Sequence, residues 1–215
     1  MKAIGGRDAL LARKSVKRTL TLEVPAAGMK ADIEASQMAG KTYMKTTMPG
    51  LGDILAGFDG TTAWAIDPMQ GARLLAGKEL DQAKSQSELT PELHESPNLK
   101  SIEVVADTTF EGRPAYKVKV VRATGEEVRE YFDKENGLLL GEQMTVETPM
   151  GPVEAMTIRQ DYKQMGGTLV ASRQLQRAGG QEFVITLLSV EENKVDPTVF
   201  DLPAQIKALV PAPAK

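Results

Sequence analysis

The stretch that decides the fold runs from residue 153 to residue 191 and reads VEAMTIRQDYKQMGGTLVASRQLQRAGGQEFVITLLSVE. The glycine pairs at 166–167 and 179–180 divide it into three segments in which apolar and polar residues alternate. Hairpin turns need residues that tolerate φ > 0, and half-buried strands need a period of two. The stretch therefore predicts three consecutive antiparallel strands at 153–164, 168–178 and 181–191.

The same turn signals recur along almost the whole chain. Pairs such as Asp59-Gly60, Glu111-Gly112 and Asn136-Gly137 separate further alternating segments. Additional strands are predicted at 14–24, 29–36, 42–48, 54–58, 62–66, 101–110, 113–122, 126–133 and 138–148. In the first of them, Val16, Arg18, Leu20, Leu22 and Val24 share one face. The fold class is therefore mainly β, with one large antiparallel sheet.

A single domain covering 1–215 is expected, because an all-β sheet or barrel of this length commonly folds around one core. Residues 1–12 are predicted to form a shortened N-terminal helix or an entry loop. A helix is expected over 76–93, where helix formers are frequent. Its apolar stripe is thin, which favours a cover over an opening rather than a core helix. Residues 204–215 are expected to form a tail.

Composition excludes several classes of protein. The formal net charge of −3 and the isoelectric point of about 5.4 argue against a nucleic-acid partner. No apolar run approaches the length of a transmembrane segment. The chain has no cysteine, so it offers no disulfide and no thiolate ligand or nucleophile. Met1 is expected to open a trimmed mature segment, because no signal peptide precedes Lys2.

No catalytic constellation stands out, and neither a cofactor nor a metal is expected. The motifs of serine hydrolases, Ser-x-x-Lys enzymes and phosphate-binding loops are missing. A zinc site needs three or four ligands, and His94 is the only histidine. We therefore expect His94 to be a solvated loop residue, and we expect the protein not to be an enzyme. A site assembled from distant polar residues inside a barrel stays open as a weaker alternative.

One segment is rich in large apolar and flexible side chains. Methionine suits a pocket for disordered lipid tails because its thioether chain adapts to irregular volumes, and the chain holds 10 methionines. The alternative interpretation is that these residues form an ordinary core, since methionine also fills gaps there. The predicted lining of a hydrophobic groove consists of Met44, Met48, Leu51, Ile54, Leu55, Phe58 and Trp64.

Short motifs along nearly the full chain resemble the outer-membrane lipoprotein-sorting superfamily of LolA- and LolB-like proteins. The motifs are Ala3-Ile4-Gly5-Gly6 before the first strand, Gly57-Phe58-Asp59-Gly60 followed by Ala63-Trp64, Pro68 and Gly71 before the helix, and Asn193 with Phe200-Asp201-Leu202-Pro203 near the end. The resemblance implies an unclosed barrel, a strongly curved antiparallel sheet of about eleven strands. One or two helices would cap its concave apolar side, which would hold acyl chains or another hydrophobic ligand.

The resemblance also implies a place in the periplasm or at the outer membrane. Two features depart from the better-known carriers, because the long first helix is missing or short and the segment 76–93 is polar. Two hypotheses follow. The first is a carrier or binding protein for a lipid, a lipoprotein acyl chain or another hydrophobic ligand. The second is an interaction domain that accompanies a secreted protease or envelope complex and has no ligand of its own.

Overall fold

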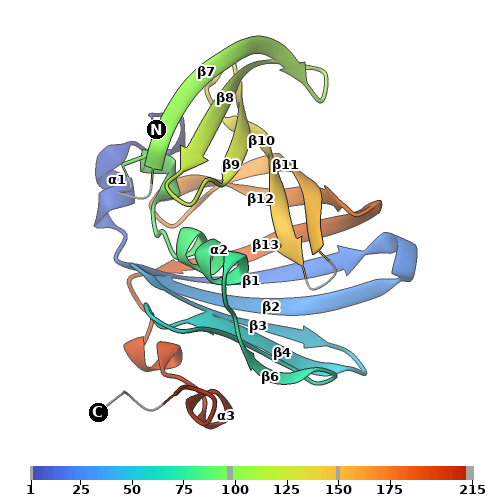
Figure 1. Cartoon of the computed structure of the whole chain (residues 1–215). Helices are drawn as coiled ribbons and strands as arrows, with labels where there is room; N and C mark the ends of the chain where they lie inside the picture. The colour runs from blue at the N-terminus through green and yellow to red at the C-terminus, as the bar shows by residue number, and fades with distance from the viewer. Residues whose placement is uncertain (1, 96–98, 149–150, 212–215) are drawn as a thin grey trace.

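The computed structural model describes residues 2–95, 99–148 and 151–211, and it is built around one antiparallel sheet of 13 strands. Figure 1 shows that the sheet bends into a strongly curved barrel that does not close. The mainly β, unclosed-barrel architecture expected from the sequence is confirmed. The strands are β1 (Ser15–Val24), β2 (Met29–Met38), β3 (Lys41–Met48), β4 (Gly52–Phe58), β5 (Ala63–Asp67), β6 (Gly71–Leu74), β7 (Leu99–Phe110), β8 (Arg113–Arg122), β9 (Glu127–Asp133), β10 (Leu139–Thr148), β11 (Gly151–Met165), β12 (Thr168–Ala178) and β13 (Gln181–Glu192).

The order of the strands shows that the barrel is open between β6 and β7, the two edge strands. Across the sheet they run β6-β5-β4-β3-β2-β1-β13-β12-β11-β10-β9-β8-β7. All neighbours are consecutive in sequence except β1 and β13, which pair over most of their length. The two edge strands, β6 and β7, are nevertheless consecutive in the chain. The segment that joins them must therefore cross the opening, and we call its residues 75–95 the strap.

Two differences from the predicted strands are small and have local causes. β6 was missing from the prediction because four residues are too few to show an alternating pattern. The resemblance implied about eleven strands, whereas the sheet has 13. The remaining strands lie within a few residues of their expected bounds.

The helix predicted over 76–93 is shorter than expected. α2 covers only Lys78–Gln86, and a 3₁₀ turn, η3, follows at Pro91–Leu93. A proline disfavours helical backbone in the residue before it, and Thr90 accordingly has a φ of −134°. The prediction of an α-helix over residues 87–93 was therefore wrong, because these residues form turns, including η3, and irregular backbone.

The two ends of the chain carry the other helices. The N-terminal segment contains the turn η1 (Lys2–Ile4) and the short helix α1 (Arg7–Ala12). The C-terminal segment contains η4 (Pro197–Phe200) and α3 (Ala204–Lys207). The predicted tail thus begins as a helix, and its residues 212–215 lie outside the described part.

The two faces of the sheet are covered by different elements. α2 contacts β4 on one side of the opening and β10 on the other, so it lies on the concave face. The C-terminal segment packs outside the barrel, with η4 against β3 and α3 against β6 (Figure 1). Phe200 and Ile206 are buried there. The concave face is therefore the one that the strap covers, and the outer face is the one that the C-terminal segment covers.

Candidate ligand-binding surface on the concave face

Partly exposed apolar side chains gather on the concave face of one half of the sheet. The strand register places Leu20 opposite Ile33 and Leu22 opposite Ile185, all on the face that the strap covers. Met44 is 41% exposed, and the others are partly exposed. We call this set the apolar wall, and it comprises Leu20, Leu22, Ile33, Met44, Ile54 and Ile185.

The structure divides the seven predicted groove residues between the two faces of the sheet. Met44, Met48, Ile54 and Phe58 alternate with outward residues on β3 and β4, so they lie on the concave face. Leu51 lies in the turn between these strands and is 52% exposed. The structure therefore brings four of the seven residues to one surface.

Leu55 and Trp64 lie on the outer face instead. Leu55 alternates with Ile54, and Trp64 lies opposite Gly57, which shares the face of Leu55. Trp64 is only 1% exposed, and a Cβ at Gly57 would meet its ring at 2.7 Å. The glycine therefore makes room for the indole. One groove cannot be lined by these two residues together with Met44.

Hydrogen bonds hold the strap to the strands on the apolar side of the opening. Gln37 of β2 donates from Nε2 to the backbone carbonyl oxygens of Gln86 at 3.0 Å and Glu88 at 2.7 Å. Arg73 of β6 forms a two-pronged ion pair with Glu79 of α2, with both N–O distances at 2.9 Å. This contact lowers the pKa of the Glu79 carboxyl group. The strap is thus anchored to β2 and β6.

Ion pairs hold the strap on the other side. Arg122 of β8 lies 2.9 Å from Glu88 of the strap and 3.4 Å from Glu126. Ser85 of α2 donates to the same Glu126 carboxylate at 3.0 Å. Since α2 also packs near β10, the strap bridges both sides of the opening.

Charged side chains occupy the concave face of β9, β10 and β11. Glu130 lies directly opposite Glu142, and Arg159 donates to Glu142 at 2.9 Å. These side chains are 16%, 21% and 25% exposed. His94 of the strap completes the group through Glu130. We call Glu130, Glu142, Arg159 and His94 the polar layer.

The environment of His94 differs from the expected one. Its Nε2 lies 3.0 Å from Oε2 of Glu130, and the side chain is 22% exposed. The hydrogen bond to Glu130 raises the pKa of His94, and burial and the charge of Arg122 oppose this rise. The prediction of a solvated loop histidine was therefore wrong. No group of three or more potential metal ligands occurs within the described residues.

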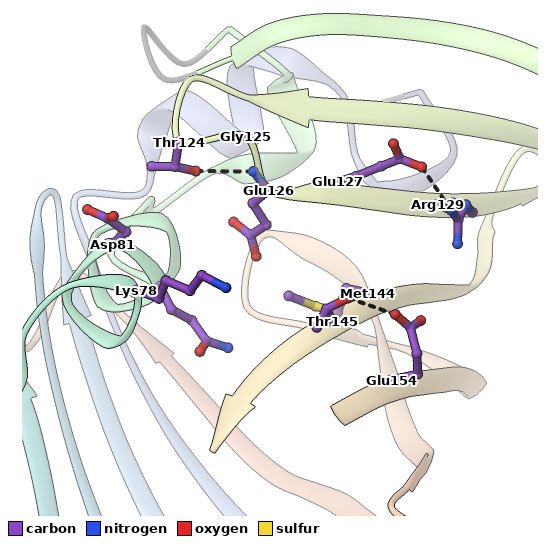
Figure 2. Close-up of a pocket in the computed structure, with 11 residues that line it drawn as sticks. Lys78, Asp81, Thr124, Gly125, Glu126, Glu127, Arg129, Met144, Thr145 and Glu154 are labelled. Carbon is purple, nitrogen blue, oxygen red and sulfur yellow. Dashed lines mark hydrogen bonds and ion pairs between the residues drawn. The ribbon is translucent and has the colours of Figure 1, made fainter. Parts of the chain in front are cut away.

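A polar pocket opens between α2 and the strands β9, β10 and β11. Its volume is about 420 Å³. Figure 2 shows Lys78 and Asp81 of α2 across the hollow from Met144 and Thr145. Glu127 pairs with Arg129 at 3.0 Å on its wall. Because charged groups dominate this lining, the pocket suits polar groups rather than a hydrocarbon chain.

The polar layer and the strap contacts were not predicted from the sequence. Their partners are far apart in the chain, as in the pair of Arg122 with Glu88 or of His94 with Glu130. Arg18, an arginine among the apolar residues of its strand face, indicated only that this face is not wholly apolar. Within residues 2–95, 99–148 and 151–211, no helix is long and apolar enough to cross a bilayer.

The sequence matches no protein-family model and no curated protein. Solved structures of similar architecture are nevertheless found. A DUF1329 family protein from Desulfovibrio piger is 10% identical at a TM-score of 0.62, with 92% of this chain and 94% of that chain covered. A LolA superfamily protein from Nitrosomonas europaea is 10% identical at a TM-score of 0.61, with 87% and 89% covered.

A third similar structure is a putative outer membrane lipoprotein-sorting protein domain from Vibrio parahaemolyticus. It is 11% identical at a TM-score of 0.57, and the match covers 90% of this chain and 94% of that one. Identities this low show a shared fold and nothing about ligands. The curved, unclosed sheet is thus a LolA-like fold, which confirms the fold that the sequence motifs implied.

Proposed function

We propose that the protein is a non-enzymatic carrier or binding protein for a lipid, a lipoprotein acyl chain or another hydrophobic ligand. The observation that carries this proposal is the apolar wall. Its aliphatic side chains line a concave surface but stay partly exposed. Each methylene group of a ligand that such a surface removed from water would contribute about 0.8 kcal/mol. Met48 extends the same surface beside Met44 and Ile54.

We place this function in the bacterial periplasm or at the outer membrane. The support is the likeness in fold to a putative outer membrane lipoprotein-sorting protein domain. The strap would act as the cover of the ligand, because it crosses the opening and is held by side-chain contacts on both sides. Ligand entry would require some of these contacts to open.

Adjacent residues of β13 allow a matched test. Ile185 lies on the concave face, and Thr186 lies on the outer face opposite Arg173. We expect Ile185→Glu to weaken binding of the neutral dye N-phenyl-1-naphthylamine by about tenfold or more, because a carboxylate there would have to be desolvated. Thr186→Glu should bind like the wild type. Fluorescence titration gives both affinities, and equal affinities of the two variants would contradict the proposal.

The interaction-domain alternative is favoured by one observation, the exposed edge strand β7. β7 is a twelve-residue strand at one edge of the sheet. Two of its apolar side chains are exposed, Val104 to 63% and Ile102 to 48%. Exposed edges of this kind can pair with another chain. Native mass spectrometry of the protein purified from cells separates the two functions. A carrier retains a lipid-sized mass, whereas an interaction domain retains a protein partner or nothing.

A further inference from the structure

Arg18 is an unusual residue of the concave face, because it is a partly buried cation in an apolar row. It precedes Leu20 and Leu22 on the same face of β1. Its one hydrogen bond to a described residue runs from Nη1 to Oε1 of Gln37, at 3.1 Å. A guanidinium group carries five N–H donors. Most of its donors therefore have no partner in the part of the chain that the structure describes.

Most other arginines of the chain form ion pairs. Carboxylates lie within 4.0 Å of eight of the ten, namely Arg7, Arg13, Arg73, Arg113, Arg122, Arg129, Arg159 and Arg177. Arg173 has no such partner among the described residues, but it is exposed to solvent. Arg18 is thus the one partly buried arginine that no described carboxylate neutralises.

The surroundings of Arg18 do not supply the missing negative charge. Arg13 lies nearby but is itself paired with Glu192 at 3.0 Å, and Arg159 is paired with Glu142. Burial, followed by repulsion from Arg13, lowers the pKa of Arg18. Glu92 and Glu192 act in the opposite direction without reaching ion-pair distance. A buried cation in this state costs free energy unless an anion joins it.

We propose that Arg18 binds the anionic head group of a single-chain amphiphile, a carboxylate or a phosphate, while the hydrocarbon chain lies along the apolar wall. This inference rests on the proposed function and specifies its ligand. Residues of one strand face repeat at about 6.6 Å, so Leu20 and Leu22 continue directly away from the guanidinium group. A guanidinium fork matches the geometry of both anions.

The test compares charged ligands with neutral ligands of the same chain length. Palmitate and methyl palmitate are titrated against the displacement of N-phenyl-1-naphthylamine at pH 8, with lysophosphatidate and monopalmitoylglycerol as the phosphate arm. A charge-assisted hydrogen bond corresponds to about tenfold or more in affinity. We expect the wild type to prefer palmitate, lysophosphatidate or both over the neutral counterpart by that factor. A preference for only one of them identifies the head group.

Variants assign the preference to Arg18. Arg18→Met should weaken binding of the charged ligands and bring them within about twofold of their neutral counterparts. Arg18→Lys should keep part of the preference, because the charge remains while the fork is lost. Arg173→Met, which removes an exposed arginine of the outer face, is the matched control and should behave like the wild type.

The two proposals fail in different ways. If the wild type binds charged and neutral ligands equally, the inference about Arg18 is wrong while the carrier function stands. The same holds if Arg18→Met keeps the full preference. If none of the four ligands and no dye binds, both proposals are wrong. The wild-type comparison needs no folded variant, so it decides the matter even if Arg18→Met does not fold.

Discussion

Two groups of side chains on the concave face, the apolar wall and the polar layer, differ in how they are paired within the protein. In the apolar wall, aliphatic residues such as Leu22 and Ile185 remain partly exposed. In the polar layer, the charged side chains of Glu130 and Glu142 are only 16% and 21% exposed. The charged groups form ion pairs within the protein, whereas the aliphatic groups leave part of their apolar surface exposed.

This contrast indicates which of the two groups has free surface for a ligand. The charged groups of the polar layer are paired within the protein, His94 with Glu130 and Arg159 with Glu142, although Arg159 Nε has no hydrogen-bond partner among the described residues. The first pair links the strap to β9, and the second links β10 to β11. The apolar wall gains free energy only when something apolar covers it. A ligand is therefore expected on the wall and not on the layer.

The largest effect on stability is expected behind the wall, at Trp64. Its side chain is 1% exposed and packs on Gly57 on the outer face. Trp64→Ala removes a fully buried indole, so we expect a loss of about 3–5 kcal/mol in the free energy of unfolding. Urea denaturation followed by circular dichroism measures this loss.

The comparison becomes sharper if Trp64→Ala is set beside Met44→Ala. Met44 is 41% exposed on the concave face, so its truncation should cost about 0.5 kcal/mol or less but weaken dye binding. If Trp64→Ala abolished dye binding per folded molecule while hardly changing stability, the assignment of Trp64 to the structural side of the sheet would be wrong.

A smaller effect is expected in the polar layer. Glu142→Leu leaves the Arg159 guanidinium partly buried without its carboxylate, and we expect a loss of about 1–3 kcal/mol. The double variant Glu142→Leu, Arg159→Met removes both charges and should recover most of the loss. Thermal unfolding of the wild type and the three variants, including Arg159→Met alone, completes the cycle. Additive losses would show that the pair does not act as a unit.

The strands could be predicted because their signals are local. Glycine pairs such as Gly179-Gly180 have positive φ angles in the structure, and the alternating residues between such pairs form the long hairpins. The pairing of β1 with β13 joins residues about as far apart as the chain allows, as in Val16 with Glu192. No local pattern contains that pairing, and only the resemblance to a known family anticipated the barrel.

The candidate site could be predicted only in part, for a physical reason. Alternation assigns Ile54 and Leu55 to opposite faces, but it does not reveal which face is concave. The predicted groove therefore combined residues of the apolar wall with Leu55 and Trp64, which pack on the outer face. The polar layer depends on contacts such as that of His94 with Glu130, 36 residues apart, and such contacts leave no trace in spacing.

The smallest expected effect is a pH dependence of the polar layer, and His94 is well suited to reveal it because it is the only histidine. The hydrogen bond to Glu130 raises the pKa of His94 above its ordinary value of 6.5. Its stabilising contribution should therefore be fully present below pH 6.5, while Glu130 stays ionised, and should disappear as the pH rises through the raised pKa. The charge of Arg122 lowers the pKa of His94, and a hydrogen bond with the backbone of Glu92 raises it.

His94→Gln removes the titrating group but keeps a hydrogen-bond donor. We expect the wild type to exceed this variant by about 1 kcal/mol in the free energy of unfolding near pH 6, and the difference to vanish at alkaline pH. Urea denaturation from pH 5.5 to pH 9.5 measures both curves. A constant difference over this range would mean that the charge of His94 does not hold the strap to β9. A difference that grew with pH would mean that the neutral imidazole is the stabilising form.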